Sequence, residues 1–416
     1  MARLKGFQKL TSIDQALKNL LDALRIGKLK TTTVDLPLAL NRILAENIIA
    51  EEGLPGFDRS AVDGYAVKAE DTVRASQFNP KILKIVEKNE ISTGQVRQIW
   101  TGKPIPKGAN AVVMLENTKQ TDGEVEVWTS LTPWENVSRK GEDVQKGEMA
   151  LEAGIRLKPQ HLGMIAAFGK AEVKVFAKPK VAVLTTGNEL VEIGGKLEGS
   201  QIFDSNRLII SSMCRELGAE PVDLGIARDE INEVVKKLRT GMEKADLIIT
   251  TGGTSVGAAD FVPEALNKIG EPGVIVHGVA MRPGMPTALA VVEGKPIIAL
   301  SGNPVAAMIG FDVFAKPLIR RMLGLKQAEP RPTVSAKITR RVNAALGRRT
   351  FVRVRVSQSG GEFLAEPVSA KGSGLISTIT KSNGYVIVQE NREGLEEGEI
   401  VSVHLFDNLE GVDGDV

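Results

Sequence analysis

The run LIITTGG at residues 247–253 consists of a short apolar stretch that ends in two glycines, and it is the clearest of several such runs that together indicate the fold class. Similar apolar runs recur in this half of the chain, at residues 181–184, 222–226, 274–276 and 296–300. Helical patterns separate most of them, at residues 205–217, 230–242 and 304–323. Apolar strands alternating with helices are typical of a mostly parallel sheet covered on both faces. The sequence therefore predicts a doubly wound α/β domain over residues 179–328.

On either side of this domain the pattern is β-rich. Between residues 51 and 147, Gly, Pro and Asp separate short β-type runs such as 111–114 and 124–128, which predicts a small inserted domain. After a proline-bearing linker, residues 351–356, 385–388 and 400–404 read as strands. In the first of these, Val352, Val354 and Val356 alternate with arginines. We expect a β-barrel, or a sandwich, over residues 329–408.

Two helices are expected outside the α/β domain, at residues 11–27 and 158–169. In the first, Ser12 and Gln15 fit a capping box and Gly27 fits a C-terminal stop. If the two helices pack together, residues 1–50 and 148–178 form one helical and extended domain that carries the β-rich region as an insertion.

Composition narrows the class of protein. Lys and Arg number 53 and Asp and Glu 51 in a chain of 416 residues, so the net charge is only +2. This balance disfavours a general nucleic-acid or membrane-surface binder. The first residues have no apolar leader and no run is long enough to span a membrane, so we expect a cytoplasmic protein.

The supply of metal ligands is similarly limited. The chain has one cysteine, Cys214, and three histidines that are far apart in sequence. This excludes an internal disulfide and disfavours a zinc site built from Cys or His. Any metal is therefore expected to be a hard cation bound by oxygen ligands.

Four of the predicted strands run into unusual loops. These loops are Thr185–Glu189, Ala227–Asp229, Thr251–Gly257 followed by Asp260, and Ser301–Pro304. Ligands of open parallel sheets bind at the carboxyl ends of the strands, so all four loops are expected at one edge. Gly252, Gly253, Gly302 and Ser255 offer close backbone or hydroxyl donors for phosphate oxygens, and Asn303 begins a helix. Glu189, Asp229 and Asp260 add carboxylates, which beside a phosphate typically hold Mg²⁺.

Each loop also has a purely structural interpretation. Asn303 with Pro304 fits a helix cap followed by a first-turn proline, and the glycine pair fits a tight turn. Together the loops favour a binding site. They match neither GxxxxGK[ST] nor GxGxxG, so an unconventional phosphate ligand is suggested.

Polar, glycine-rich strings in the inserted region are, by composition alone, only loops. Their order along the chain, however, is informative. PGFDRSAVDGYAV begins at residue 55 and is followed by TGKPIPKGANAVVM and RKGEDVQKG. VAVLTTGNEL, IFDSNR, ITTGGTSVGAADF and LSGNPVAA come later. This series resembles the molybdopterin molybdenumtransferase family (MoeA and the gephyrin E-domain) over roughly residues 10–405.

The resemblance implies a function. Members of this family insert molybdate, or tungstate, into adenylylated molybdopterin and release AMP, with Mg²⁺ assisting. They form homodimers in which the α/β domain of one subunit and the β insertion of the other share an active site. Carried over by motif, the catalytic residues are Asp63, Glu189, Asp229 and Asp260, with Glu189 and Asp260 as Mg²⁺ ligands. The substrate-binding positions are Thr101, Asp143, Gly252, Gly253, Ser255, Gly302, Asn303, Arg282, Arg353 and Ser373, of which the last two match positions that contact the oxyanion.

The chain departs from the family pattern near the expected oxyanion site. Arg282 keeps one cation of the usual KPGKP string, but Met285 stands where a second lysine is common. Gly278 likewise replaces a frequent lysine, Ala306 replaces a serine and Arg59 an asparagine. Since a dianion needs compensating donors, we expect modest oxyanion affinity unless another cation, such as Arg59, replaces the lost charge.

Two other functions remain to be distinguished from this one. A non-catalytic molybdopterin-binding scaffold or paralogue would tolerate the change at Met285, whereas retention of the acids at the strand ends argues against such drift. A nucleotide hydrolase that shares only the α/β domain is disfavoured by the motif around Asp63.

Overall fold

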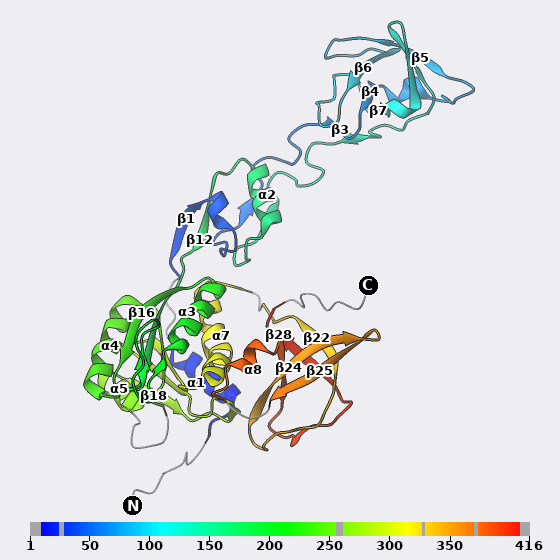
Figure 1. Cartoon of the computed structure of the whole chain (residues 1–416). Helices are drawn as coiled ribbons and strands as arrows, with labels where there is room; N and C mark the ends of the chain where they lie inside the picture. The colour runs from blue at the N-terminus through cyan, green and yellow to red at the C-terminus, as the bar shows by residue number, and fades with distance from the viewer. Residues whose placement is uncertain (1–9, 25–28, 255–260, 327–328, 370–372, 408–416) are drawn as a thin grey trace, which may run out of the picture. The chain divides into compact units, whose positions relative to one another are not determined.

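The computed structural model describes residues 10–24, 29–254, 261–326, 329–369 and 373–407 (Figure 1). The chain divides into two compact units. The first combines Met1–Thr32 with Phe176–Val416, and the second is Thr33–Val175. Within the described residues, no helix is long and apolar enough to cross a membrane.

A six-stranded sheet forms the centre of the first unit. The strands lie in the order β16 (Glu220–Ala227), β13 (Lys180–Thr186), β17 (Leu247–Thr251), β21 (Lys295–Leu300), β20 (Ala288–Val292) and β18 (Pro272–His277). The first four run parallel, whereas β20 and β18 are each antiparallel to their neighbours. The predicted α/β sheet is therefore confirmed, with an antiparallel pair at one edge.

Helices cover both faces of this sheet (Figure 1). On one face, α4 (Ile231–Lys244) and α5 (Phe261–Ile269) share an apolar core with the strands. On the other face, α3 (Ser205–Leu217) contacts a helical run made of α6 (Pro304–Gly310), the π-helical segment η4 (Phe311–Ala315) and α7 (Lys316–Met322). The doubly wound arrangement places the carboxyl ends of the four parallel strands at one edge.

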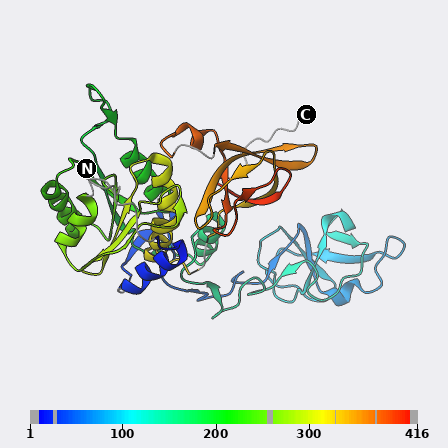
Figure 2. The ribbon, with the colours of Figure 1, turned by 90° about the horizontal axis from the view of Figure 1, so that it is seen from below.

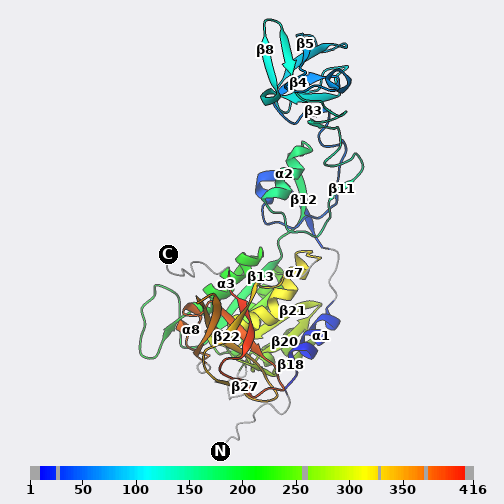
Figure 3. The same ribbon diagram turned by 90° about the vertical axis from the view of Figure 1, so that its right-hand side faces the viewer.

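The N-terminal helix α1 (Ile13–Ala23) packs on β18 and β20 of the first unit (Figure 3). Thr11, just before it, donates its amide to the Gly278 carbonyl and accepts from the Ala280 amide, at 3.0 and 2.8 Å. Leu20, which faces inward, is fully buried. This helix therefore belongs to the first unit, whereas the helix near residues 158–169 belongs to the second.

The ends of α1 differ in part from the prediction. The Ser12 hydroxyl accepts from the Gln15 amide at 3.3 Å, but the Gln15 side chain donates to Asn19 at 2.7 Å instead of returning to the cap. Only half of the capping box is present. The helix also ends at Ala23, and Gly27 lies outside the described residues.

The C-terminal part of the first unit is a closed five-stranded barrel, shown in orange and red in Figure 2. Its strands follow one another in the order β24 (Arg349–Ser359), β25 (Glu362–Ser369), β22 (Thr333–Ile338), β28 (Ile400–Leu405) and β26 (Gly384–Val388), which pairs back onto β24. This selects the barrel over the sandwich. Smaller elements are β23 (Val342–Asn343) with β27 (Gly394–Leu395), and α8 (Ser377–Thr380).

The contacts that join the barrel to the α/β domain include a strand pairing and a half-buried ion pair. The short strand β19 (Met281–Arg282) adds in parallel to the start of β24. In addition, Arg331 donates from Nη2 to both carboxylate oxygens of Asp312 in η4, at 2.8 and 2.6 Å, and from Nη1 to the Phe406 carbonyl at 3.0 Å. Burial lowers the pKa of the neighbouring Lys316 ammonium. This half-buried ion pair fixes the position of the barrel against the helical run.

The second unit contains the β-rich insertion and the segments that flank it. A six-stranded sheet has the order β7 (Ala111–Met114), β4 (Gly64–Val67), β6 (Gln95–Ile99), β5 (Lys81–Ile85), β9 (Glu124–Val127) and β8 (Thr118–Thr121). The flanking segments have an apolar core of their own around Leu44, Leu157 and Ile165. The β-rich region is therefore an insertion between them, as expected.

The remaining elements of this unit are short. They are α2 (Pro159–Ala167), the 3₁₀ turns η1 (Leu36–Ala39), η2 (Ala69–Thr72) and η3 (Leu115–Asn117), and the strand pairs β1 (Thr31–Asp35) with β12 (Glu172–Phe176), β2 (Ile48–Ile49) with β11 (Met149–Leu151), and β3 (Arg59–Ser60) with β10 (Val137–Ser138). The predicted helix near residues 158–169 is confirmed as α2.

Candidate functional site

The loops after β13, β16, β17 and β21 meet at one edge of the α/β sheet, as their parallel order requires. They line a cavity of about 440 Å³, the strand-edge cavity. Its lining consists of Thr186, Gly187, Glu189, Leu190, Ile202, Asn206, Asp229, Thr251, Gly252, Gly253, Thr254, Pro286, Ser301, Gly302 and Asn303. The predicted residues Glu189, Asp229, Gly252, Gly253, Gly302 and Asn303 are thus brought together. Ser255 and Asp260 lie outside the described residues.

The glycine pair after β17 allows the strand ends to approach closely. Gly252 and Gly253 both have positive φ, of 93° and 64°. A Cβ atom on Gly252 would collide with the Thr186 carbonyl, and one on Gly253 would lie 2.7 Å from Val262. The Gly252 amide, however, already donates to the Leu300 carbonyl at 3.1 Å. Gly252 therefore provides space and conformation, and is not available as the amide donor to phosphate that the sequence suggested.

Asn206, in the first turn of α3, lies in this cavity and was missed as an individual site residue. Its amide nitrogen donates to the Gly302 carbonyl at 2.7 Å, which ties α3 to the loop after β21. Its Oδ1 atom is buried and has no hydrogen-bond partner among the described residues. A buried acceptor of this kind is costly unless a ligand group donates to it. The signal was its place in the IFDSNR motif, at residues 202–207.

Two carboxylates border the same cavity. Glu189 lies just before the short strand β14 (Leu190–Val191), which pairs with β15 (Ile202–Phe203). Asp229 exchanges hydrogen bonds with Asn188, since each backbone amide donates to the other side chain at 3.3 Å. In the described part of the chain, no group of three or more His, Cys, Asp or Glu side chains forms a metal site. The two acids nevertheless offer the hard oxygen ligands that Mg²⁺ prefers beside a phosphate.

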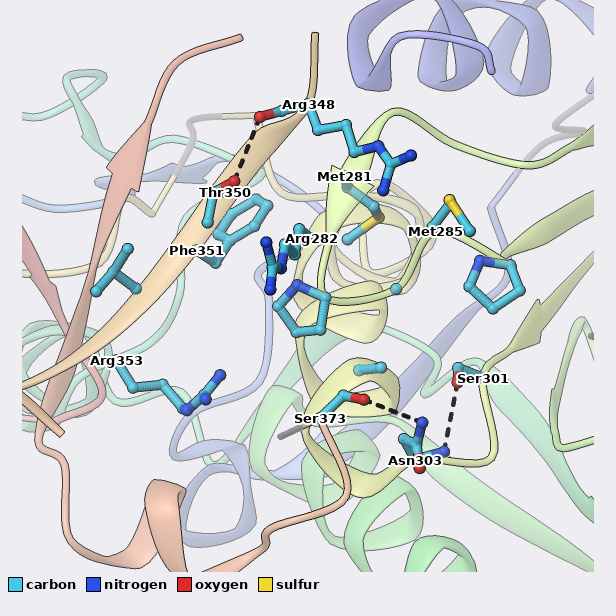
Figure 4. A pocket seen from close by; sticks show the side chains of 15 residues that line it. Met281, Arg282, Met285, Ser301, Asn303, Arg348, Thr350, Phe351, Arg353 and Ser373 are labelled. Atoms are coloured by element: carbon cyan, nitrogen blue, oxygen red, sulfur yellow. Dashed lines mark hydrogen bonds between the residues drawn. The ribbon is translucent and has the colours of Figure 1, made fainter. Parts of the chain in front are cut away.

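A second cavity, of about 520 Å³, lies between the α/β domain and the barrel, and is called here the arginine cavity (Figure 4). It is lined by Met281, Arg282, Pro283, Gly284, Met285, Pro286, Ser301, Asn303, Ala306, Arg348, Thr350, Phe351, Val352, Arg353 and Ser373. The three residues expected at the oxyanion, Arg282, Arg353 and Ser373, are all present. The described lining carries three arginines and no Asp or Glu, so its charge favours an anion.

Arg353 illustrates how the barrel contributes to this cavity. On β24, Val352, Val354 and Val356 face the barrel core as predicted, while Arg355 is exposed. Arg353 alternates with the valines along the strand, but it is only 3% exposed, and it lines the cavity together with residues of the α/β domain. This burial lowers the pKa of its guanidinium. An arginine nevertheless stays charged near neutral pH, so a positive charge is held at the cavity wall.

Asn303 connects the two cavities. It occupies the cap position of α6, with Pro304 following as predicted, but its side chain makes no capping hydrogen bond. Instead it donates from Nδ2 to the Ser373 hydroxyl of the barrel at 3.0 Å. The Val305 amide donates to the Ser373 carbonyl at 3.2 Å. Pro286, Ser301 and Asn303 line both cavities, so the two ligand spaces adjoin.

The other predicted site residues lie in the second unit. The Asp63 carboxylate accepts from both the amide and the hydroxyl of Thr101, each at 2.7 Å. These hydrogen bonds lower the pKa of Asp63. Asp143 is exposed and donates its amide to the Leu54 carbonyl at 3.0 Å. Asp63 and Thr101 therefore form one fixed pair, and Arg59 lies nearby on β3 in the same unit.

Comparison with known proteins covers nearly the whole chain. Family models match residues 11–169 ("MoeA N-terminal region (domain I and II)"), 182–321 ("Probable molybdopterin binding domain") and 335–406 ("MoeA C-terminal region (domain IV)"). The molybdopterin molybdenumtransferase of Haemophilus influenzae is 36% identical, over 96% of this chain and 100% of the relative. That of Bacillus subtilis is 35% identical, over 95% and 94%.

Solved structures agree with this. The crystal structure of the molybdopterin biosynthesis MoeA protein from Pyrococcus horikoshii OT3 has a TM-score of 0.82 and 32% identity, and it covers 96% of this chain and 100% of its own. The match therefore includes the α/β domain, the insertion and the barrel in one order. The chain belongs to the molybdopterin molybdenumtransferase (MoeA) family, whose members are transferases of molybdenum cofactor biosynthesis.

Proposed function

We propose that the protein inserts molybdate, or tungstate, into adenylylated molybdopterin and releases AMP. The observation that carries this proposal is the pair of adjoining cavities in the first unit. One has carboxylates and close-packed strand ends, the other has arginines and no acid among its described lining residues, and Asn303 borders both. A ligand with a phosphate at one end and a metal-accepting dithiolene at the other matches this pair.

The strand-edge cavity is assigned to the phosphate end of the pterin ligand. The wall formed by the strand ends is lined by Gly253, Gly302 and Asn303. Asn206 also lines this cavity, and its Oδ1 atom has no hydrogen-bond partner among the described residues. Glu189 and Asp229 border it, and Asp260 and Ser255 follow β17 in sequence. Bound Mg²⁺ would be held by Glu189 and Asp260, and would neutralise charge on the phosphoanhydride that is cleaved.

The arginine cavity is assigned to the oxyanion. Arg282 and Arg353 present forked donors that suit tetrahedral oxygens, and the Ser373 hydroxyl is oriented by Asn303. Molybdate and tungstate have the same charge and nearly the same size, so fixed donors discriminate poorly between them. We therefore include both as substrates.

The proposed reaction balances without a change of oxidation state. Two metal–sulfur bonds form from the dithiol, and one oxygen of the oxyanion leaves with the two thiol protons as water. Water cleaves the phosphoanhydride bond, so that AMP is released and the pterin keeps its terminal phosphate. The protein residues have to bind, orient and desolvate these groups.

A homodimer and a cytoplasmic location belong to the same proposal. Asp63, Thr101 and Asp143 lie in the second unit, and the family resemblance implies that these residues complete the site of a partner subunit. The Asp63–Thr101 pair supports a fixed role, since its hydrogen bonds keep the carboxylate charged and oriented. A fully active monomer in solution would contradict this part of the proposal.

The deciding experiment measures AMP release from adenylylated molybdopterin, with Mg²⁺, in the presence and absence of molybdate or tungstate. We expect oxyanion-dependent turnover and formation of the metal-loaded cofactor. Binding of the pterin without AMP release would instead identify a scaffold. Release of AMP from unrelated nucleotides, with no dependence on the pterin, would identify a hydrolase.

A further inference from the structure

Arg348, the residue immediately before β24, lines the arginine cavity but is not among the residues assigned to the oxyanion above. We propose that Arg348 is a third oxyanion-binding residue and supplies the positive charge that Met285 lacks. This inference rests on the proposed function, because it names a further binding residue of the same site.

The position of Arg348 is fixed by the turn that precedes it. Gly347 adopts a φ of 77° and donates its amide to the Glu390 carbonyl at 2.7 Å. The Arg348 carbonyl accepts from the Thr350 hydroxyl at 3.4 Å. The side chain is half-buried and lines the arginine cavity. Figure 4 shows it reaching from the start of β24 toward the side of the cavity that carries Met281 and Met285.

The adjacent Arg349 is a useful comparison, because its guanidinium forms ion pairs with carboxylates of the protein itself. Its guanidinium donates to both oxygens of Asp14 in α1, at 3.1 and 2.8 Å, and lies 3.0 Å from a carboxylate oxygen of Glu390. In contrast, no side chain in the described part of the chain forms an ion pair or hydrogen bond with the Arg348 guanidinium. Arg349 therefore links β24 to α1, whereas the charged group of Arg348 is available to a ligand in the arginine cavity.

The charge balance of the cavity then explains Met285. This residue lines the same wall, but its thioether carries no charge where the family commonly has a lysine. Ala306 also lines the cavity and brings no hydroxyl. A dianion at this position would therefore have Arg282 and Arg353 as its only predicted cations. Arg348 makes a third, and because it lies in the first unit it needs no contribution from Arg59.

Three arginines also suit the geometry of the ligand. A guanidinium offers several N–H donors in a plane, so it can contact two oxygens of a tetrahedral anion at once. Arg282 lies on β19, Arg348 immediately precedes β24, with which β19 pairs, and Arg353 lies further along β24. Donors from these three positions can surround an oxyanion whose remaining neighbour is the Ser373 hydroxyl.

The test is calorimetric titration of molybdate and of tungstate into the full chain without pterin. Arg348→Gln removes the charge and keeps much of the side chain's length, while Arg348→Lys keeps the charge. Arg355→Gln is the matched control, because Arg355 is on the same strand, is exposed and does not line the cavity. A charged hydrogen bond is worth roughly 1.5–3 kcal/mol, so Arg348→Gln should weaken binding about 10- to 150-fold. Arg348→Lys should recover part of this loss, and Arg355→Gln should bind like the wild type.

A second variant protects the test against a simple folding defect. In the double variant Arg348→Gln, Met285→Lys, a lysine returns the charge from position 285, on the side of the cavity toward which Arg348 reaches, and binding should recover toward the wild-type value. Wild-type affinity in Arg348→Gln would overturn the inference while leaving the proposed function intact, provided that Arg353→Gln loses binding. If the wild-type chain binds neither oxyanion, both proposals fail. If Arg348→Gln loses binding and the added lysine restores nothing, the exchange of charge between the two positions is refuted.

Discussion

The two cavities of the first unit adjoin but are built on different principles. The strand-edge cavity is made by one domain, and its glycines, Asn206 and two acids are placed by the topology of a parallel sheet. The arginine cavity exists only where the barrel meets that domain, and its charge comes from β19 and β24. Under the proposed function, the first combines acids with an anion-binding edge and would need a bridging cation. The second would hold an anion directly.

This difference teaches how a dianion and a phosphoanhydride can be bound side by side. An uncompensated carboxylate near the oxyanion would repel it, and the described lining of the arginine cavity contains none. The acids are confined to the strand-edge cavity, where Mg²⁺ would neutralise them. Asn303, a neutral side chain, borders both spaces and can do so without disturbing either charge balance.

The largest expected effect separates the cavities by their chemistry. Glu189→Gln keeps the shape of the strand-edge cavity but removes one charge, so it should lower AMP release by roughly 100-fold or more. Asp260→Asn should act in the same direction. Oxyanion affinity, measured by calorimetry, should stay within about twofold of the wild type, because Glu189 does not line the arginine cavity. Normal AMP release in Glu189→Gln would remove this residue from the reaction.

The comparison also shows what sequence reasoning can reach. The four strand-end loops could be placed at one edge because chain order and strand direction fix them, and α3 was predicted with its observed bounds. Strand β20 was missed, since the short run of Ala, Leu and Val at residues 288–292 gives no clear period. The docking of α1 on β18 and β20 was also missed, because it depends on a long-range contact that leaves no local pattern.

The arginine cavity was harder to predict because it joins distant parts of the chain. The resemblance supplied Arg282, Arg353 and Ser373, but Arg348 and Arg349 are indistinguishable in sequence. Only packing separates them, since Asp14 and Glu390 surround one and not the other. Asn303 was correctly placed before a helix, but its bond to Ser373, seventy positions later, required the folded structure.

A charge added to the arginine cavity should produce the next largest effect. Met285→Lys restores a cation that is common in the family, and should tighten oxyanion binding by about 10-fold in low salt. The gain should shrink from about 0.01 M to about 1 M salt, because screening weakens a partly exposed charge. If Arg348 already supplies this charge, the gain should be larger in the Arg348→Gln background than in the wild type. Equal affinities in wild type and Met285→Lys would show that position 285 takes no part in the site.

A smaller effect is expected from replacing Asn303, the residue that lines both cavities. Asn303→Ala removes the donor that orients the Ser373 hydroxyl at 3.0 Å, a hydrogen bond worth about 1 kcal/mol. Oxyanion affinity should fall about fivefold, and the KM for the pterin substrate should rise by a similar factor, because Asn303 lines both cavities. Ser373→Ala is the matched control, since it should affect the oxyanion alone. A change in only one of the two readouts for Asn303→Ala would refute its joint role.

The smallest expected effect concerns the barrel, on which the arginine cavity depends and the strand-edge cavity does not. His404 on β28 stacks on Tyr385, with ring centroids 5.4 Å apart. Burial, helped by the charge of Arg331, lowers the pKa of the His404 imidazole below its ordinary value of 6.5. The unfolded chain therefore takes up this proton more readily than the folded chain does. The stability contributed by the neutral ring is complete above about pH 6.5 and is lost as the pH falls below that value.

Acidification from about pH 7.5 to about pH 5.5 should thus lower the unfolding midpoint, and His404→Phe, which cannot be protonated, should reduce this drop by about 1–3 °C. Asp63 and Glu399, whose pKa values are lowered by hydrogen bonds, lose their contribution only in more acidic solution, so the two pH windows can be separated. Thermal unfolding followed by circular dichroism measures the midpoints. Because His404 lies in the barrel, mild acid should weaken oxyanion binding more in the wild type than in His404→Phe. If oxyanion affinity depends on pH in the same way in the two proteins, protonation of His404 does not affect the arginine cavity.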